Sequence, residues 1–148
     1  MVWRPHVTVA AIIERDGRFL LVEEETDAGV RFNQPAGHLE CFEALADACV
    51  REAFEETGYA FVPRYLVGVY NWRNEPADIT YLRFAFGGDI AGQDPGRGLD
   101  EGIIAAHWLT GDEIRACRDR HRSPLIMRCI EDWLGGKRYP LDLITHYA

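Results

Sequence analysis

Residues 37–59, GHLECFEALADACVREAFEETGY, hold the most informative pattern in this chain of 148 residues. Near its end the stretch places Glu52, Glu55 and Glu56 close together. An α-helix turns about 100° per residue, so a helix over 43–57 would bring these three carboxylates within an arc of roughly 100°. Like charges at this spacing repel each other. The pattern therefore needs either a solvated helix face or a nearby cation.

Apolar residues lie on both sides of this expected helix. They are Leu45, Ala48 and Cys49 beside the glutamates, and Ala46, Val50 and Phe54 opposite. A helix enclosed by protein would hold the carboxylates in partial burial, where uncompensated charge is costly. Arg51 supplies one positive charge against three negative ones. Two interpretations remain at this point: a surface helix with incidental glutamates, or a site for a hard divalent cation.

Gly37 favours the cation site. Mg²⁺ prefers oxygen ligands and is commonly held by one or two carboxylates together with substrate phosphates. Carboxylates at i, i+3 and i+4 present their oxygens toward one point. A glycine upstream would let the backbone approach closely and offer a carbonyl oxygen as a further ligand.

The composition predicts one globular domain over residues 1–148. A formal net charge of -8 argues against nucleic-acid polymers and anionic membranes as partners. It permits a small phosphorylated ligand if a metal ion reverses the local sign. The first apolar run, 7–13, is too short to span a bilayer, and the four cysteines show no CxxC spacing. We expect a cytoplasmic protein with reduced thiols, and the acidic charge is compatible with a monomer.

The rest of the chain predicts an α/β fold in which helices cover a mixed sheet. Asp16-Gly17 is a strong hairpin signal, Gly58 suits the end of the helix, and Glu43 suits its positive start. A loop is expected over 87–102, because Gly, Asp and Pro dominate there. The main expected strands are 6–14, 18–24, 61–71, 79–87 and 103–109, and further helices are expected from Thr110 and over 123–136.

Seven positions of the opening stretch resemble the signature of the Nudix hydrolases. They are Gly37, Glu43, Arg51, Glu52, Glu55, Glu56 and Gly58. Seven matches at fixed spacing would occur by chance about once in a hundred million starting positions, so the resemblance is specific. Ala53 and Tyr59 depart from the usual aliphatic residues of the family, at packing positions.

The resemblance extends over nearly the whole chain. Several segments are similar to the NudJ-type phosphatases, a Nudix subgroup that acts on the pyrimidine pyrophosphate intermediate of thiamine synthesis and on nucleoside di- and triphosphates. They are HVTVA (6–10), NQPAGHLE (33–40), LRFAF (82–86), RSPL (122–125) and RYPLDL (138–143). The resemblance implies a Nudix-type α/β/α sandwich and metal-assisted attack of water on phosphorus in a diphosphate.

The resemblance also implies roles for the residues of the signature. The ligands of Mg²⁺, or of Mn²⁺ in its place, would be Glu52, Glu55, Glu56 and the Gly37 carbonyl. Arg51 would pair with the helix acids together with Glu43, or contact phosphate. Glu52 is the first choice for the general base. Glu101, in a later loop, is the second choice, and its alternative role is that of a solvated loop acid.

Five further residues are candidates for binding the substrate. Tyr70 and Trp72 end a strand and could stack on a heteroaromatic ring, or pack in the core or at its rim. Asn33 and Gln34 could bind polar ring edges, or bond to the turn backbone. Arg83, on an otherwise apolar strand, could contact phosphate or form a salt bridge. Tyr139 and Pro140, in the tail, could close over the pocket.

Three alternatives to a NudJ-like activity stay open at this point. The same fold could hydrolyse oxidised deoxynucleotides or ADP-ribose. A Nudix-like domain could also bind a nucleotide without cleaving it, although Glu52, Glu55 and Glu56 are all present here. A calcium-binding helix–loop–helix module is excluded, because the chain lacks the alternating Asp/Asn loop that ends in Glu.

Overall fold

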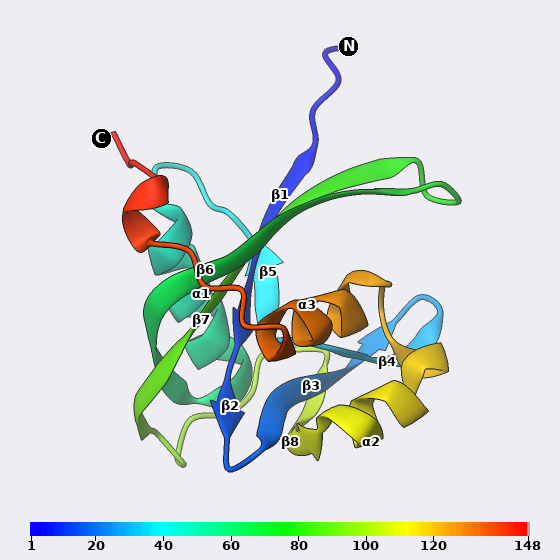
Figure 1. Cartoon of the computed structure of the whole chain (residues 1–148). Helices are drawn as coiled ribbons and strands as arrows, with labels where there is room; N and C mark the ends of the chain where they lie inside the picture. Colours follow the sequence, from blue (N-terminus) through cyan, green and yellow to red (C-terminus); the bar gives the residue numbers. More distant parts are fainter. Residues whose placement is uncertain (148) are drawn as a thin grey trace.

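Two four-stranded sheets and three α-helices make up the computed structural model, which describes residues 1–147. The first sheet has the order β5-β1-β7-β6, from β1 (His6–Ile12), β5 (Ala36–His38), β6 (Tyr59–Asn74) and β7 (Ile79–Gln93). The second sheet contains β2 (Glu14–Arg15), β3 (Arg18–Thr26), β4 (Gly29–Asn33) and β8 (Ile103–Thr110), with β3 paired to the other three. Figure 1 shows both sheets with the helices around them.

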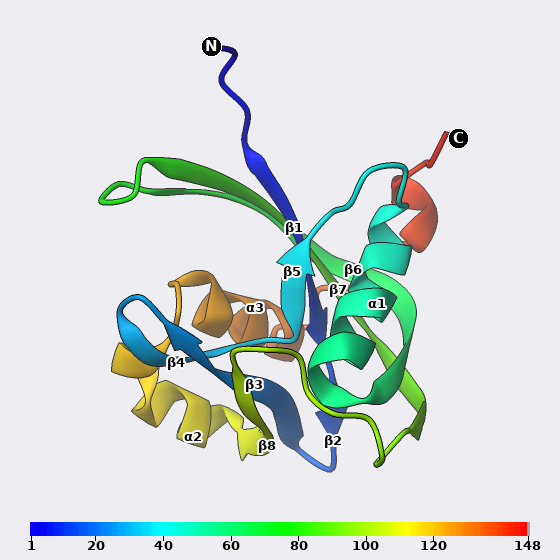
Figure 2. The ribbon, with the colours of Figure 1, turned by 180° about the vertical axis from the view of Figure 1, so that it is seen from behind.

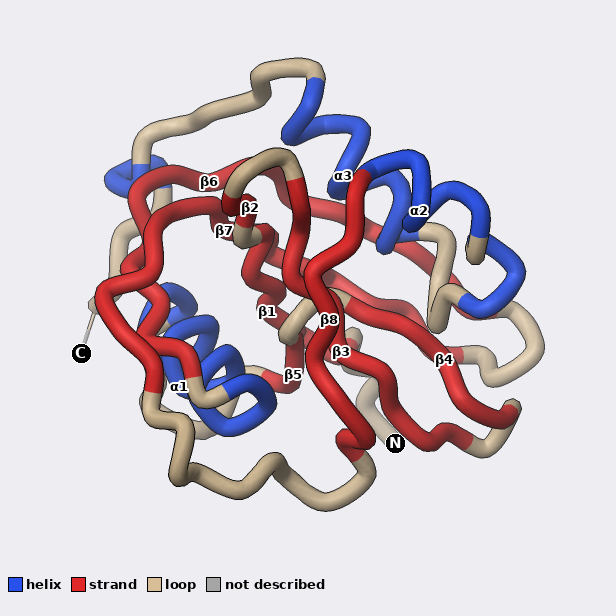
Figure 3. The backbone as a smooth tube through the Cα atoms, turned by 90° about the horizontal axis from the view of Figure 1, so that it is seen from below, coloured by secondary structure: helices blue, strands red, loops and turns tan. Residues whose placement is uncertain are grey.

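The helices lie on opposite sides of the strands, as Figure 3 shows. Helix α1 (Leu45–Thr57) covers one side, and α2 (Gly111–Ala116) and α3 (Leu125–Leu134) cover the other. Two short 3₁₀-helices, η1 (Arg118–Arg120) and η2 (Leu141–Leu143), complete the elements. The expected α/β fold, a mixed sheet between helices, is confirmed.

Strand β1 joins the two halves of the core. It pairs parallel to β7 and antiparallel to β5, so the sheet is mixed. Val9 and Ala11 pack with α1, whereas Ile12 packs with α3 on the other face. A strand buried on both faces shows no polar alternation. This explains why 7–13 is an uninterrupted apolar run.

Local signals in the sequence place several boundaries correctly. Asp16 and Gly17 have positive φ angles of 54° and 79° and form the turn between β2 and β3. Gly58 ends α1 with a φ of 75°, and its N–H donates to the Phe54 carbonyl. Thr110 forms a capping box with Glu113 at the start of α2.

Several boundaries differ from the expectation, among them those of β6, which spans Tyr59–Asn74 and not 61–71. Helix α1 begins at Leu45 and not at residue 43, because Glu43 folds back to bond the Glu40 N–H and Arg51. Part of the expected loop 87–102 is strand, since β7 continues to Gln93. Gly87 and Gly88 lie inside that strand, where a Cβ would overlap the Tyr65 ring and the β6 backbone. The glycines therefore permit close strand packing in this hairpin and do not end it.

The outer half of the β6–β7 hairpin projects from the body of the molecule (Figures 1 and 2). Its last register pair is Asn74 and Ile79, and Asp78 in the turn has a φ of 53°. Tyr81 of this hairpin contacts His6 of β1, with ring centroids 5.6 Å apart. Trp72, Asn74 and Pro76 line a hollow together with residues at the start of α3. Among residues 1–147, none of the helices has the length and apolar character needed to cross a membrane.

Two valines of β6 provide a matched test of the core. Val67 is 0% exposed and packs in the cluster with α3, whereas Val69 is 49% exposed. Val67→Ala should lower the free energy of unfolding by about 2–3 kcal/mol, because it removes two buried methyl groups and leaves a cavity. Val69→Ala should change it by less than about 0.5 kcal/mol. Urea unfolding measures both, and equal losses would contradict this assignment of the core.

Candidate active site

Arg51 lies at the centre of the acidic cluster on α1. Its Nε donates to Glu43 Oε2 at 2.7 Å, and its Nη1 donates to Glu52 Oε1 at 2.7 Å and to Glu55 Oε2 at 3.1 Å. Its Nη2 donates to the His38 carbonyl at 3.1 Å. The hydrogen bonds to Glu43 and Glu52 raise the pKa of Arg51 still further above its usual range. The expected pairing of Arg51 with Glu43 and the helix acids is present.

Glu43 precedes the helix and accepts hydrogen bonds from two nitrogens of the Arg51 guanidinium. Its Oε1 accepts from Arg51 Nη2 at 3.0 Å and from the Glu40 backbone N–H at 3.1 Å. The Arg51 hydrogen bond is the main cause that lowers the pKa of Glu43, so this carboxylate stays ionised. Arg51 therefore connects α1 to the loop before it and, through His38, to β5.

Glu52 packs directly against the backbone of β5, which lies beside α1 (Figure 2). A Cβ atom built on Gly37 would overlap the Glu52 carboxyl group. The absence of a side chain at this position thus creates the space that the carboxylate fills. Burial there raises the pKa of Glu52, and the hydrogen bond from Arg51 partly opposes that rise.

Glu56, one turn further along α1, is the most buried acid of the cluster, with 9% of its surface exposed. Its Oε1 accepts a 2.9 Å hydrogen bond from the Ala36 backbone N–H. Burial, with smaller contributions from the charges of Glu24, Glu52 and Asp100, raises the pKa of Glu56 to about 8. Glu56 therefore carries a buried carboxyl group whose ionisation is opposed both by burial and by neighbouring acids.

The residues of this cluster fit a hard divalent cation. All the available donors are oxygens, and the mutual repulsion of Glu52 and Glu56 is a cost that a cation would remove. Within residues 1–147, no three acidic, imidazole or thiol groups already converge as a ligand set. Glu52 and Glu55 instead turn one oxygen each toward Arg51.

A cleft of ≈ 580 Å³ opens beside the cluster. Its size lies in the range of small-molecule sites. The structure brings six of the expected site residues to this cleft: Asn33, Gly37, Glu52, Glu56, Trp72 and Arg83. They come from the two sheets and from α1, so the site forms where these elements meet.

Arg83 also lines the cleft and is 5% exposed. Its Nη1 donates to Gln34 Oε1 and its Nη2 to Asn33 Oδ1, both at 2.8 Å. Within residues 1–147 no Asp or Glu forms an ion pair with it, so the salt-bridge alternative is wrong. A buried guanidinium that is bonded by neutral groups retains an uncompensated positive charge beside the cleft.

The two amides that hold Arg83 have different positions. Asn33 lines the cleft, and its Nδ2 lies 3.5 Å from Glu24 Oε1. Gln34 is almost fully buried behind Arg83, where its Nε2 donates to the Ile126 carbonyl at 2.9 Å. The structure therefore does not bring Gln34 to the cleft. Gln34 instead connects Arg83 to α3.

Tyr70 and Trp72 also have different surroundings, although both lie on the same strand. The Tyr70 hydroxyl donates to Asp132 Oδ2 of α3 at 2.7 Å, and the residue does not line the cleft. Trp72 lines the cleft and stacks on Tyr81, with ring centroids 5.8 Å apart and an angle of 16°. Helix α3 covers the inner end of this strand face and leaves the outer end open.

The loop before β8 contributes Asp100 in place of the expected Glu101. Glu101 is exposed in a turn, whereas the Asp100 N–H donates to the Glu55 carbonyl at 3.3 Å. The charge of Asp100 also raises the pKa of both Glu52 and Glu56. The sequence segment LDEG contains both acids, and its composition alone does not distinguish them.

Sequence reasoning missed three residues near the cleft and misplaced a fourth. Glu24 is buried, and its Oε1 accepts a 2.8 Å hydrogen bond from Arg122. Arg122 and His38 both line the cleft. These contacts join residues far apart in the chain and leave no local signal. Tyr139, which was expected over the pocket, instead pairs with Leu66 of β6 through two 2.8 Å backbone hydrogen bonds.

The buried carboxylate of Glu56 predicts a pH-dependent cost. Its pKa rises from 4.5 to about 8 on folding, so the folded state loses stability as pH rises from 4.5 to about 8. Glu56→Gln keeps the oxygen that accepts from Ala36 and removes the charge. In a chelator, its stability should equal that of the wild type at pH 4.5 and exceed it by at most about 5 kcal/mol above pH 8.

Urea unfolding at pH 4.5, 6.5 and 8.5 measures this difference. Glu25→Gln is the matched control, because Glu25 is exposed on the same strand as Glu24. The control should follow the wild type at each pH. A constant offset between Glu56→Gln and the wild type would contradict the burial of an ionisable charge at this position.

Comparison with known proteins agrees with this geometry. The chain matches the NUDIX domain family model over residues 3–129. It is 37% identical over 145 residues to Phosphatase NudJ of Escherichia coli K12, covering 98% of this chain and 94% of that protein. Phosphatase NudJ of Shigella flexneri matches with the same identity and coverage.

Solved structures give the same result. A NUDIX hydrolase from Nitrosomonas europaea superposes with a TM-score of 0.95 at 52% identity, covering 97% of this chain and 98% of that chain. A MutT NUDIX hydrolase from Burkholderia pseudomallei, at 21% identity and a TM-score of 0.75, covers 88% of this chain and 98% of that chain and shares the fold. The acidic helix, the glycine that it packs against and these matches lead to one conclusion: the chain belongs to the Nudix hydrolase family and is a phosphohydrolase.

Proposed function

We propose that this enzyme is a Mg²⁺-dependent hydrolase that cleaves a diphosphate joined to a nucleoside or a similar heteroaromatic group. One observation carries the proposal: a single cleft is lined by Glu52 and Glu56 and also by Arg83, which forms no ion pair with an Asp or Glu among residues 1–147. A cation with its bound diphosphate would complement this lining, because the cation would neutralise the acids and the phosphate oxygens would accept from the arginine.

The residues that would hold the ion are Glu52, Glu55, Glu56 and the carbonyl of Gly37. Nudix hydrolases generally use a divalent metal ion, and an all-oxygen donor set favours Mg²⁺, with Mn²⁺ as a substitute. When bound, such an ion stabilises the negative charge that spreads over the diphosphate oxygens in the transition state. Arg51 acts as a positioning residue, since its hydrogen bonds fix the orientation of Glu52 and Glu55.

The protein's own groups supply a base and a phosphate contact. Glu52 is the first candidate for the general base that takes the proton from the attacking water. Burial raises its pKa, so it is a stronger base than an exposed glutamate. Glu101 is the second candidate and would need its exposed turn to move toward the cleft. Arg83 would donate to a phosphate oxygen while Asn33 holds it in place.

A NudJ-like substrate range is the finer part of the proposal. It comprises the pyrimidine pyrophosphate of thiamine synthesis and nucleoside di- and triphosphates, each converted to a monophosphate. The 37% identity to Phosphatase NudJ supports it, as does the Trp72–Tyr81 pair, which offers a flat surface to a heteroaromatic ring. A sanitising or ADP-ribose hydrolase of the same fold is the alternative.

The proposal includes the setting in which the enzyme works. We place it in the cytoplasm as a monomer formed by one Nudix domain over residues 1–148, with a small phosphorylated molecule as its partner. The formal net charge of -8 supports a small-molecule partner over nucleic-acid polymers or membranes. The buried thiols of Cys49 and Cys129 are compatible with a reducing compartment.

Gly37→Ala tests the contact between the helix and β5. The added methyl group overlaps the Glu52 carboxyl, so Glu52 must move away. We expect kcat/KM to fall by about 100-fold or more, because misplacement of a catalytic group by about 1 Å has this effect. Gly92→Ala is the control, since a Cβ there meets no atom within 4 Å. Retention of full activity by Gly37→Ala would contradict the role of this contact.

Glu56→Gln tests the metal site through activity. With saturating Mg²⁺ it should reduce turnover by at least about 1,000-fold while leaving the fold intact, and Glu25→Gln should retain wild-type rates. The products are to be separated by ion-exchange chromatography after incubation with the thiamine pyrimidine pyrophosphate, ordinary and oxidised nucleoside triphosphates, nucleoside diphosphates and ADP-ribose, because cleavage of ADP-ribose yields two monophosphates and no free phosphate. Near wild-type turnover by Glu56→Gln would remove this glutamate from the ligand set.

The substrate panel separates the remaining alternatives. A preference for the pyrimidine pyrophosphate and simple nucleotides supports the NudJ-like range. A preference for ADP-ribose or oxidised nucleotides would support the proposed role of the acidic site but replace the NudJ-like substrate range. Nucleotide binding without turnover of any compound would favour a regulatory domain.

A further inference from the structure

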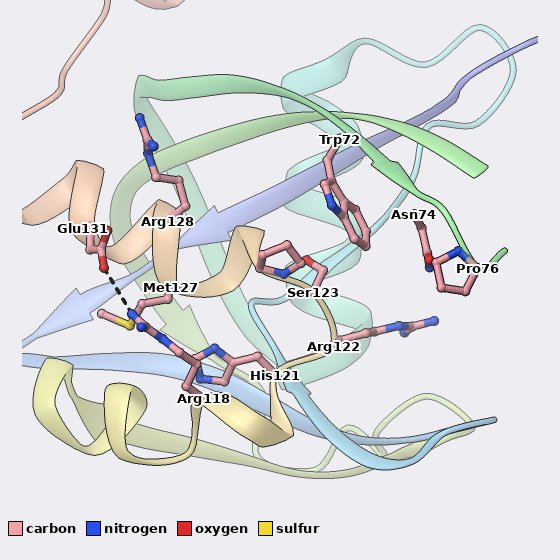
Figure 4. Close-up of a pocket in the computed structure, with 11 residues that line it drawn as sticks. Trp72, Asn74, Pro76, Arg118, His121, Arg122, Ser123, Met127, Arg128 and Glu131 are labelled. Carbon is pink, nitrogen blue, oxygen red and sulfur yellow. Dashed lines mark hydrogen bonds and ion pairs between the residues drawn. The ribbon is translucent and has the colours of Figure 1, made fainter. Parts of the chain in front are cut away.

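A second compartment of ≈ 670 Å³ lies next to the cleft (Figure 4). The outer part of the β6–β7 hairpin forms one side, through Trp72, Asn74 and Pro76. The segment that contains η1 and the start of α3 forms the other side. None of the glutamates of α1 lines this compartment, so it is separate from the acidic site.

The two cavities share a boundary. Trp72, Asn74, Arg122 and Ser123 line both of them. The second compartment therefore adjoins the cleft at Trp72. Because each cavity has the volume of a small-ligand site, the two together accommodate an elongated molecule with two ends.

The second compartment is basic in a chain that is acidic overall. Arg118, Arg122 and Arg128 line it, and Glu131 is the only acid among its lining residues. His121 also lines it, but burial lowers the pKa of this imidazole, so it adds no charge at neutral pH. The lining thus carries three positive charges and one negative charge, whereas the whole chain has a formal net charge of -8.

Two of these arginines, Arg118 and Arg128, are available to a ligand, whereas Arg122 donates to the buried Glu24 at 2.8 Å. Arg118 Nη2 lies 3.4 Å from Glu131 Oε1, and the two side chains are 59% and 46% exposed. An exposed pair of this length contributes little to stability, so Arg118 can turn toward another anion at low cost. Arg128 is also 59% exposed, and its acid partner is Asp132. If Arg128 turns toward a ligand, Asp132 still has Lys137 as a second cation at 3.2 Å.

The remaining lining suits the body of an organic ligand. Figure 4 shows Trp72 on one side of the hollow and Met127 on the other, with Ser123 between them. Aromatic and thioether surfaces pack against a ring or a sugar, and guanidinium groups bind phosphate through paired N–H donors. This combination is suited to a phosphorylated nucleoside-like group rather than to a free inorganic ion.

We propose that the second compartment binds the far end of a substrate whose diphosphate lies in the cleft, and that it selects substrates carrying a further phosphate on that end. The proposal rests on the proposed function for the position of the diphosphate. It adds a class of substrate: diphosphate diesters with a phosphorylated second moiety. Arg118 would recognise that phosphate, Arg128 would turn toward it from the opposite side of Met127, where Figure 4 shows its guanidinium, and Trp72 would separate the two ends.

The test uses two dinucleotides that differ by one phosphate, NAD⁺ and NADP⁺. Dissociation constants are measured by calorimetry with Mg²⁺ for the methylene-bridged analogues of both dinucleotides, whose P–C–P linkage is not hydrolysed, so that the metal site stays intact and neither ligand is consumed. The NADP⁺ analogue should bind about 5–20-fold more tightly than the NAD⁺ analogue. The substitutions Arg118→Ser or Arg128→Ser should bring the ratio of the two constants toward one.

Two further variants make the test specific. Glu131→Gln removes the competing acid and should increase the preference for NADP⁺ by about 2–5-fold. Arg115→Ser is the matched control, because Arg115 is an exposed arginine of α2 that pairs with Asp112 and lies outside both cavities. It should leave the ratio unchanged.

The outcomes distinguish this proposal from the proposed function. Equal affinity for both dinucleotides would overturn the proposed role of the second compartment. The same loss of preference in Arg115→Ser as in Arg118→Ser would also overturn it. The proposed function is tested separately by hydrolysis of a simple nucleoside diphosphate by the wild type. If that hydrolysis is absent while the NADP⁺ preference depends on Arg118, the compartment stands and the hydrolytic assignment fails.

Discussion

The hydrogen bonds of Arg51 are the interaction on which the acidic site depends. One guanidinium contacts Glu43, Glu52, Glu55 and the His38 carbonyl, and so joins α1 to the loop before it and to β5. Without this charge, carboxylates of a partly buried helix would repel each other and favour exposure to water. Arg51 satisfies Glu43, Glu52 and Glu55, whereas Glu56 accepts a hydrogen bond from the neutral Ala36 backbone N–H. Ionisation of Glu56 therefore lacks the support of Arg51, and burial raises the pKa of this group to about 8.

Much of this arrangement is predictable from sequence, because its signals are local. Helical spacing places the acids on one face, Gly58 ends the helix, and the uninterrupted apolar run of β1 indicates a strand buried on both sides. Gly37 was expected to allow close approach of the backbone. The sequence does not predict which group lies against Gly37. In the structure the Glu52 carboxylate fills that space.

The features that sequence missed depend on contacts between distant segments. The two-residue side-chain period of a strand places Tyr70 and Trp72 on the same face. This period does not predict that α3 contacts Tyr70 and leaves Trp72 at the cleft. Glycine normally weakens a strand, yet the Tyr65 ring fills the space above Gly87 and β7 continues. Likewise, Asp100 and Glu101 are equivalent by composition, and only the bond to the Glu55 carbonyl directs Asp100 toward the cluster.

The buried groups of the cleft are better explained by ligand binding than by stability. An ionised Glu56 and an Arg83 without a carboxylate partner each cost folding free energy, and a direct ion pair between acid and base would remove both costs. The fold instead keeps them unpaired, with Asn33 and Gln34 accepting from two nitrogens of Arg83. Neutral amides orient the guanidinium without neutralising it. The separation of charge is thus maintained by specific hydrogen bonds, and the cation with a bound diphosphate that we propose as the ligand would match both kinds of charge in the cleft.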